Sequence, residues 1–536
     1  MIFHFINLCG PYVPGAPPML FKKLIIDSFL TIQKISMKNP LTRFNFKGKI
    51  PLGPNETEKK ELNDNPGESQ NQPDNRRDFL KKVSLGGLGL GFMFDHDPAK
   101  EIEYITQKVN RAGKPSDLKI TDVRVAVVTG APMVCPILRI DTNQGITGYG
   151  EIRDAASPKY GLFLKSRLLG KNPCNVEQIF KSIKQFGGQG RAAGGVCGVE
   201  MALWDLAGKA YGVPVYQMLG GKFRDYIRIY GDTPEVDDPD GFAKKMKERL
   251  ALGLTFLKMD FGIELLAGIP GALVGANNWN VKQQWGLHEP DKGNANSYSM
   301  TKHPFTRVQI TDKGLEIIQE YVGKVRQAIG YDVPLAADHS GHFDVNTAIR
   351  LGNAVEKYQL AWLEDMVPWE LTDQWKQVTD AINTPTLTGE DIYLKENFIK
   401  LIDARAVDMI HPDLASSGGL LETKKIGDYA EERGVPMAMH FAGTPICCMA
   451  NIHCAAATEN VVALENHSLD VPWWQDLVTG IEKPIFNKGF IKVPDTPGLG
   501  VELNEAVVKQ HLKSGELYFA PTEEWNKIDS WDREWS

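Results

Sequence analysis

The chain has 536 residues, of which 42% are hydrophobic and 24% are charged, a composition typical of a globular protein with two or three domains. Its net charge of −7, with no basic stripe interleaved with aromatic residues, argues against a nucleic-acid partner. No apolar run reaches the length of about 18 residues that a membrane span needs. The seven cysteines form no Cys-x-x-Cys pair and are expected to be mostly buried thiols.

The front of the chain is expected to lie outside the folded domains. Residues 1–74 contain the stretch NETEKKELNDNPGESQNQPDN, which is poor in apolar residues and is therefore predicted to be a disordered leader. Residues 75–96 carry Arg76 and Arg77, then an aromatic residue, a leucine and a Gly-rich apolar run, which resembles a twin-arginine export signal. This pattern predicts a periplasmic protein. A basic amphipathic linker, and with it a cytoplasmic location, is the alternative.

An α+β capping domain is predicted over residues 117–225. The alternating valines of DVRVAVV predict a strand, and the runs PILRID and ITGYGEI predict a β-hairpin after it. The segment VEMALWDLAGKAY has apolar residues three and four positions apart, and Gly212 and Pro214 follow it. This pattern is typical of an amphipathic helix with its stop signal.

From Ile227 onward the pattern changes to alternating strands and helices, which predicts a parallel barrel over residues 226–475. The candidate strands are the eight runs IRIYGD, FLKMDFG, PLAADHS, LAWLEDM, PTLTGED, AVDMIHPD, PMAMHFA and VALENHS. The predicted fold class is therefore α/β, a (β/α)8 or modified TIM barrel with an α+β N-terminal cap.

Two segments depart from the barrel pattern. Lys258 and Asp338 lie in consecutive strands but are 80 residues apart, where neighbouring units take about 25. The excess at about 263–310 is expected to be a lid or specificity loop over the active face. Residues 476–536 return to strand-and-turn character and are predicted to pack back on the cap and complete it.

Ionisable residues stand at the ends of six candidate strands, at intervals of 23 to 27 residues along the chain. The C-terminal ends of the strands in a parallel barrel all open onto one face, where catalytic groups gather. We therefore expect these six side chains to meet in one site: Asp338, Glu364, Glu390, Asp413, His440 and Glu465.

The first three of these residues predict a metal site. Three neighbouring carboxylates cannot all stay ionised without a cation, and a set of oxygen ligands favours Mg²⁺. We expect Asp338, Glu364 and Glu390 to bind one Mg²⁺ per subunit, the alternative being surface acids at loop starts. Asp413 ends the strand before His440, and a carboxylate beside an imidazole is the arrangement of a general base.

Residues 117–500 resemble the enolase superfamily, specifically its mandelate racemase/muconate lactonising branch. The segments that carry the resemblance are GVEMALWDLAGKAYGVPVYQMLGG, HPDLASSGG and MAMH. The resemblance implies removal of a proton α to a carboxylate, assisted by Mg²⁺ bound to the three acids. It also implies that His440 and Asp413 form the base dyad and that Lys258 faces the substrate carboxylate. Glu465 would donate a hydrogen bond to the enolate oxygen if protonated, or form a barrel salt bridge.

One departure from the branch points to the reaction. Many members carry a Lys-x-Lys pair in the second strand, but this chain has Asp260 two residues after Lys258. The second base of a racemase is therefore missing, whereas one base suffices for elimination of water. The acid that protonates the leaving hydroxyl is expected to be His339 or His342, or else His440 in both roles.

The sequence thus predicts a lyase: a Mg²⁺-dependent dehydratase that converts an aldonate-type sugar acid to a 2-keto-3-deoxy acid. An epimerase or a cycloisomerase acting through the same enediolate is one alternative. A non-catalytic sugar-acid binding protein is another, although such a protein need not keep three metal ligands and a base dyad. The predicted partner is a small sugar acid, and the family resemblance suggests a homo-oligomer.

Overall fold

The computed structural model describes residues 115–233, 236, 238–261, 265–266, 269–274, 309–338 and 343–527. The predicted leader, the export-signal segment, most of the long insertion, and both His339 and His342 lie outside these residues. The export signal therefore stays a prediction. No helix in the described part of the chain is both long and apolar enough to cross a membrane.

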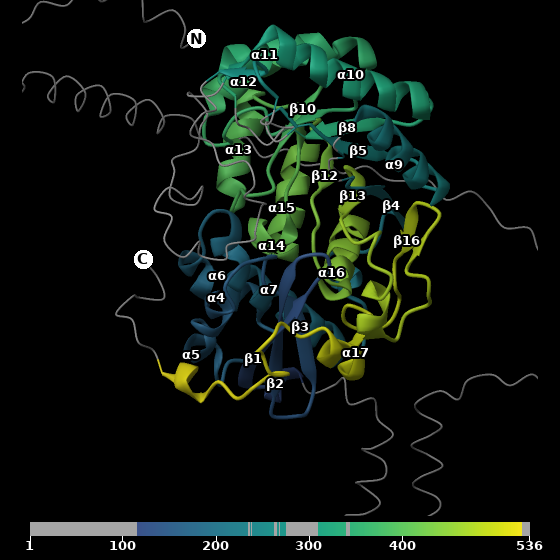
Figure 1. The fold of residues 1–536 in the computed structure, drawn as a ribbon. Helices are drawn as coiled ribbons and strands as arrows, with labels where there is room; N and C mark the ends of the chain where they lie inside the picture. Colours follow the sequence, from purple (N-terminus) through teal and green to yellow (C-terminus); the bar gives the residue numbers. More distant parts are fainter. Residues whose placement is uncertain are drawn as a thin grey trace, which may run out of the picture. The chain divides into compact units, whose positions relative to one another are not determined.

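The capping domain begins with a three-stranded antiparallel sheet, and helices pack beside it (Figure 1). Helix α7 follows the predicted pattern, ends at Gly212 in the left-handed conformation, and lies unusually close to the sheet. A Cβ atom on Gly148 or Gly150 would stand 2.3 Å or 2.0 Å from a carbonyl oxygen of α7, so glycine is required there. The elements are β1 (Ile120–Thr129), β2 (Val134–Thr142), β3 (Thr147–Glu151), α4 (Lys159–Leu162), α5 (Lys165–Leu168), α6 (Val176–Ile183), α7 (Gly194–Tyr211) and α8 (Val215–Met218).

Eight parallel strands form a closed barrel, which confirms the predicted fold class. Each candidate run contains one strand, neighbours in sequence pair in order, and β13 pairs back with β4. The strands are β4 (Tyr226–Gly231), β5 (Leu257–Asp260), β8 (Leu335–Asp338), β9 (Leu363–Glu364), β10 (Thr386–Thr388), β11 (Met409–Ile410), β12 (Met437–Met439) and β13 (Val461–Asn466).

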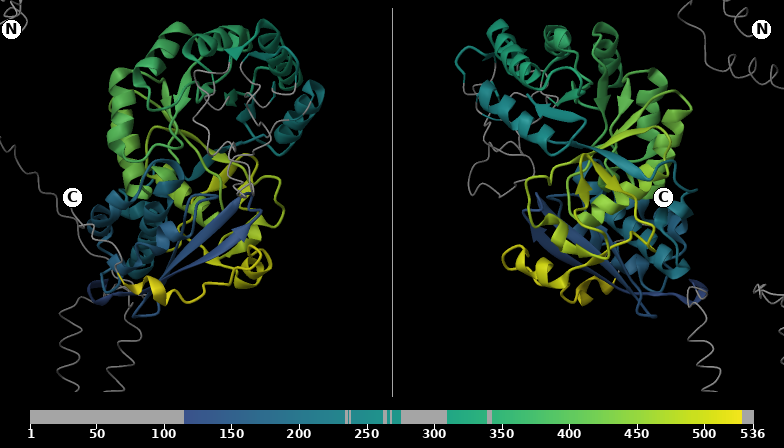
Figure 2. Two further views of the ribbon diagram at one scale, coloured as in Figure 1. Left: turned by 60° about the vertical axis from the view of Figure 1, so that its left-hand side comes forward. Right: turned by 90° about the vertical axis from the view of Figure 1, so that its right-hand side faces the viewer.

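Helices surround the barrel strands (Figures 1 and 2). Several begin at a side chain that caps their free N–H groups, which fixes where each strand-to-helix loop ends. Asp344 caps α11, and Thr444 caps α16, where Pro445 occupies the first helical position. The helices are α9 (Pro239–Ala251), α10 (Asp312–Ile329), α11 (Val345–Val355), α12 (Thr372–Ala381), α13 (Lys395–Ala404), α14 (Leu414–Ser417), α15 (Leu420–Glu431) and α16 (Pro445–Ala456).

The ends of the long insertion are joined to each other. Strand β6 (Leu273–Val274) pairs antiparallel with β7 (Gln309–Ile310), and α10 begins directly after this pair. The chain between the two strands lies outside the described residues. The predicted lid or specificity loop therefore stays a prediction.

The C-terminal segment contacts both domains, as the two views of Figure 2 show. Strand β16 (Phe490–Lys492) pairs antiparallel with barrel strand β4, and β15 (Phe486–Asn487) extends this edge. Strand β14 (Val478–Thr479) pairs with β17 (Glu502–Leu503), before α17 (Glu505–Gln510). Further on, Thr522 donates a hydrogen bond to the Val123 carbonyl in the cap. The segment was predicted to pack on the cap, and the sequence did not reveal that it also extends the barrel sheet.

Two buried carboxylates of the cap accept hydrogen bonds from the first residues of barrel helices. The Glu200 side chain, on α7, lies 2.7 Å from Leu420 N and 3.1 Å from Leu421 N, where α15 begins. Glu151, at the end of β3, accepts a bond of 3.1 Å from Thr444 N at the start of α16. Burial raises the pKa of Glu200 to about 7 and that of Glu151 to about 8. These two acids therefore link the cap to the barrel.

Replacement of Glu200 tests this contact. Glu200→Ala leaves two buried backbone N–H groups without an acceptor, so we expect the free energy of unfolding to fall by about 1–3 kcal/mol in urea titrations. Glu431→Ala is the matched control, because Glu431 is exposed on α15 itself and should change stability by less than about 0.5 kcal/mol. Equal stability of the two variants would contradict the assignment of Glu200 as a cap-to-barrel contact.

Candidate active site

Lys258 lies at the centre of the predicted site and is the second residue of β5. Its Nζ atom is 2.9 Å from Glu465 Oε1, 3.1 Å from Glu364 Oε1 and 3.3 Å from Asp338 Oδ2. The Lys258 side chain is only 3% exposed, and burial opposes its charge. The three carboxylates outweigh burial and hold its pKa well above the usual value. Lys258 is therefore a buried cation that joins three strands of the barrel.

His411 is a second buried cation beneath this site, and the sequence interpretation did not single it out. Its Nδ1 atom lies 3.0 Å from Glu364 Oε1, and its Nε2 atom lies 2.7 Å from the Tyr230 hydroxyl. Tyr230 in turn donates to Glu465 at 3.2 Å. Burial opposes the charge of His411, but Glu364 and Glu465 raise its pKa to about 10. His411 therefore forms ion pairs with both carboxylates, and its Nε2 atom also hydrogen-bonds to Tyr230.

The predicted metal ligands lie on consecutive strands. Asp338 pairs in register with Glu364, and Glu390 follows β10 three residues after Leu387, the residue that pairs with Glu364. All three acids also lie close to a fourth carboxyl group, that of Asp365. Burial and the negative charges of Asp338, Glu390 and Glu364 raise the pKa of Asp365 well above its usual value. The three negative charges therefore converge on one region, which fits a site for a divalent cation.

The orientation of these acids differs from a metal-bound arrangement. Among the described residues, two sets of ligand atoms lie within 4.8 Å of one another, and neither is the predicted triad: they are His440, Glu465 and His467, and Glu364, His411 and Glu465. Glu364 contacts Lys258 and His411 instead, and Glu390 Oε2 lies 3.1 Å from His440 Nε2. Glu364 is thus oriented toward Lys258 and His411, and Glu390 toward His440.

His440 and Asp413 form the pair that the sequence predicted. His440 Nδ1 lies 2.5 Å from Asp413 Oδ2, and both side chains are almost fully buried. The other oxygen of Asp413 accepts a bond of 2.6 Å from Ala415 N. Because Nδ1 is bonded to the carboxylate, His440 presents Nε2 to the carboxylates of the site.

Arg153, in the loop after the cap hairpin, reaches this dyad from the other domain. Its guanidinium lies 3.0 Å from Asp413 Oδ2 and 2.7 Å from both Asp154 Oδ1 and the Ser416 hydroxyl, and it contacts Glu390 at 3.4 Å. The Arg153 side chain is 1% exposed. The sequence shows no sign of this role, because the contact joins residues about 260 positions apart.

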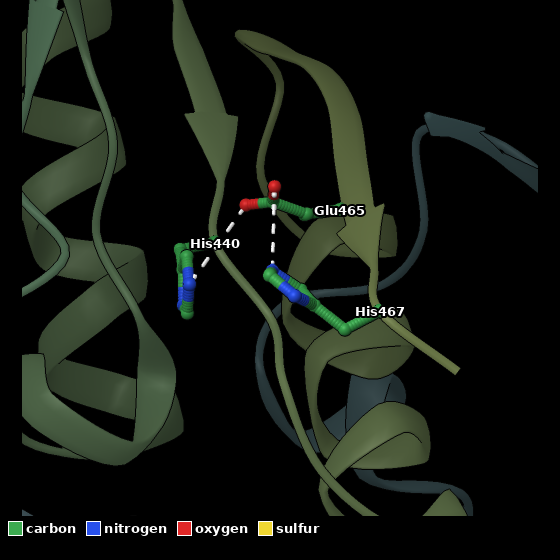
Figure 3. Close-up of side chains that lie close together, drawn as sticks. All are labelled: His440, Glu465 and His467. Carbon is green, nitrogen blue, oxygen red and sulfur yellow. Dashed lines mark ion pairs between the residues drawn. The ribbon is translucent and has the colours of Figure 1, made fainter. Parts of the chain in front are cut away.

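Another pair, also absent from the sequence interpretation, lies beside His440. His467 Nδ1 is 3.1 Å from Asp232 Oδ2, at the end of β4, and its Nε2 is 3.4 Å from Glu465 Oε1 (Figure 3). A signal for it existed: His467 stands two residues after Glu465, and strand alternation puts both side chains on one face. Burial disfavours the charged form of Glu465, but Lys258 and His467 hold its pKa well below the usual value. The two cations thus favour the ionised form of Glu465, and its contact with Lys258 is the barrel salt bridge that the sequence offered as the alternative to a hydrogen-bond donor.

A cap over a closed barrel, with acids and histidines at the strand ends, defines an enzyme of the enolase superfamily. The mandelate racemase/muconate lactonizing enzyme N-terminal domain matches residues 101–220, and the enolase C-terminal domain-like family matches residues 292–507. The chain belongs to the mandelate racemase/muconate lactonizing enzyme family, which confirms the resemblance found in the sequence.

Relatives give the comparison more detail. The chain is 34% identical to a D-xylonate dehydratase of Haloferax volcanii over 76% of this chain and 93% of that protein. It is 29% identical to a D-galactonate dehydratase family member of Pantoea ananatis, over 73% and 94%. A solved mandelate racemase/muconate lactonizing enzyme-like protein of Rubrobacter xylanophilus superposes with a TM-score of 0.63 at 29% identity, over 75% and 99%.

Arg153 and Arg191 both bind Asp154, so a comparison of the two tests how much the buried Arg153 contributes to stability. Arg153→Met leaves several buried acids without their cation, and we expect it to lower the free energy of unfolding by about 3–5 kcal/mol. Arg191 also binds Asp154, at 2.9 Å, but is 27% exposed, so Arg191→Met should cost less than about 1 kcal/mol. Urea titrations of both variants measure the difference. Equal losses would show that burial of Arg153 adds nothing.

Proposed function

We propose that the protein is a Mg²⁺-dependent dehydratase of an aldonate-type sugar acid, which removes the proton α to the carboxylate and eliminates water to give a 2-keto-3-deoxy acid. The observation that carries the proposal is the His440–Asp413 dyad facing a set of converging carboxylates. The dehydratase names of the relatives support the same reaction class, a hydro-lyase.

Asp338, Glu364 and Glu390 are the residues that would hold the cation. When bound, Mg²⁺ would supply positive charge to the substrate carboxylate, which lowers the free-energy barrier for removing the proton from the α-carbon. Lys258 lies among the same carboxylates and provides a second, permanent positive charge in the site. Burial excludes water from Lys258 and Glu364, which strengthens these interactions.

His440 is the proposed base. Asp413 holds the proton of Nδ1, so Nε2 is the atom that accepts the α-proton of the substrate. Arg153 and Ala415 N fix the Asp413 carboxylate, which keeps the imidazole ring in one orientation. The dyad is therefore preorganised by contacts from both domains.

Two alternatives use the same site. Epimerisation needs a second base on the opposite face, and Asp260 stands where that lysine would be, so elimination is favoured. Cycloisomerisation of an anhydro sugar acid needs only one base and shares the first step. The other alternative is a non-catalytic sugar-acid binding protein. Such a protein would not need the buried His440–Asp413 dyad, so the presence of the dyad favours an enzyme.

A substrate screen tests the proposal. The purified chain is incubated with Mg²⁺ and a library of aldonic, aldaric and uronic acids that begins with D-xylonate. Formation of a keto acid, detected with semicarbazide, is the expected result. Solvent deuterium in recovered substrate without keto acid would identify an epimerase instead. A library without any reaction would refute the dehydratase proposal.

Replacement of the base gives a second test. His440→Asn is expected to reduce kcat by about 10²–10⁴-fold or more, because it removes the imidazole that is proposed to accept the proton. Mg²⁺ binding, followed by titration calorimetry, should persist. His511→Asn is the control, since His511 stacks on Trp473 in the C-terminal segment and takes no part in the site. Unchanged activity of His440→Asn would refute the base assignment.

A further inference from the structure

A second histidine–carboxylate pair stands next to the proposed base. Asp232 follows β4 and His467 follows β13, and these two strands close the barrel. The ring centroids of His440 and His467 are 5.4 Å apart. Of the site's three described imidazoles, His467 is the most exposed, at 16%, against 6% for His440 and none for His411. His467 is therefore the most accessible of the three described imidazoles.

The contacts of His467 orient one nitrogen and leave the other available. Nδ1 is held by Asp232, and Nε2 points toward Glu465 from the same strand (Figure 3). Within the described part of the chain, Nε2 makes no hydrogen bond of normal geometry. The charged groups around the ring are Asp232 from β4, Glu465 from β13, His440 from β12 and Lys258 from β5.

We propose that His467, held by Asp232, is the general acid that protonates the hydroxyl group leaving the substrate. The inference rests on the proposed dehydratase function and assigns a residue to the one chemical role that the His440–Asp413 dyad leaves open. It replaces His339 and His342, which the sequence suggested for this role.

The proton and electron balance of the step follows from the two imidazoles. His440 Nε2 takes the proton from C2, and the electrons of that C–H bond form the C1–C2 double bond of the enediolate. These electrons then form the C2–C3 double bond while the C3–O bond breaks. The leaving oxygen takes the proton of His467 Nε2 and departs as water, and the enol product becomes the 2-keto-3-deoxy acid.

Electrostatics supports the division of roles. Burial disfavours the charged form of His467, but Asp232 and Glu465 together hold its pKa well above the usual value. His467 thus carries a proton at neutral pH. Two titratable groups in different environments, one accepting and one donating, are the usual arrangement for acid–base catalysis.

The barrel order separates this proposal from the earlier candidates. His440 and His467 follow the adjacent strands β12 and β13, so the proton leaves and the hydroxyl is protonated from the same side of the substrate. His339 and His342 come after β8 in the sequence, and β8 is four strands from β12 in the ring of eight, but the two histidines themselves lie outside the described residues.

A substrate with a better leaving group isolates the acid. The probes are D-xylonate, or whichever aldonate the screen identifies, and its 3-deoxy-3-fluoro analogue, each with Mg²⁺. Fluoride leaves without a proton donor, so it needs only the base. We expect His467→Asn to lower dehydration by about 10²–10⁴-fold while fluoride release stays near the wild-type rate. His440→Asn should lose both reactions.

Each other outcome has a defined meaning. If His467→Asn slows both reactions equally, or neither, His467 is not the acid. If His339→Asn or His342→Asn shows the selective loss instead, the acid is one of the two histidines that follow β8 in the sequence, and the proposal is overturned. Asp232→Asn, which keeps the imidazole, should show the same selectivity with a smaller loss, and covers the case in which His467→Asn fails to fold. If the wild-type protein releases neither keto acid nor fluoride, the dehydratase function itself fails.

Discussion

The contact between Lys258 and three carboxylates is the interaction on which the site depends. A buried carboxylate is costly unless it is paired, and here one ammonium group compensates Asp338, Glu364 and Glu465 from three different strands. His411 repeats this compensation one layer below, and Arg153 does so at the dyad. Several carboxylates can therefore stay buried and close together at one end of the barrel.

The same charges divide the site into two halves. On one side lie Asp338, Glu364 and Glu390, the acids proposed to hold the cation. On the other lie two imidazoles, His440 and His467, each bonded to its own carboxylate. Glu465 lies between the halves and contacts Lys258 and His467, so its ionised state is fixed by its neighbours. The positive charges of Lys258 and the proposed cation lie among these acids, and they would attract an anionic substrate to the site.

Much of this could be predicted from the sequence, because a barrel repeats. Apolar runs located all eight strands, most of them at a regular period, and the acid or histidine at the end of six of these runs indicated the face that they share. The pairing of His440 with Asp413 followed from adjacent strands. His467 could have been found by the same logic, because strand alternation places it beside Glu465. Arg153 could not, since its partner Asp413 is remote in sequence and no local periodicity links a cap loop to a barrel strand. The orientation of Glu364 and Glu390 could not be predicted either, because it depends on which side chains from other strands lie nearest in space.

The carboxylates of Glu151 and Glu200 have a consequence for how the two domains can change. Each belongs to the cap by sequence but completes the start of a barrel helix, α16 or α15. A cap taken from a relative would have to place both acids at the same positions. Otherwise, α15 and α16 would begin with backbone N–H groups that have no hydrogen-bond acceptor. Replacement of the whole cap by that of a relative is therefore disfavoured, whereas changes in loops that leave Glu151 and Glu200 in place are not.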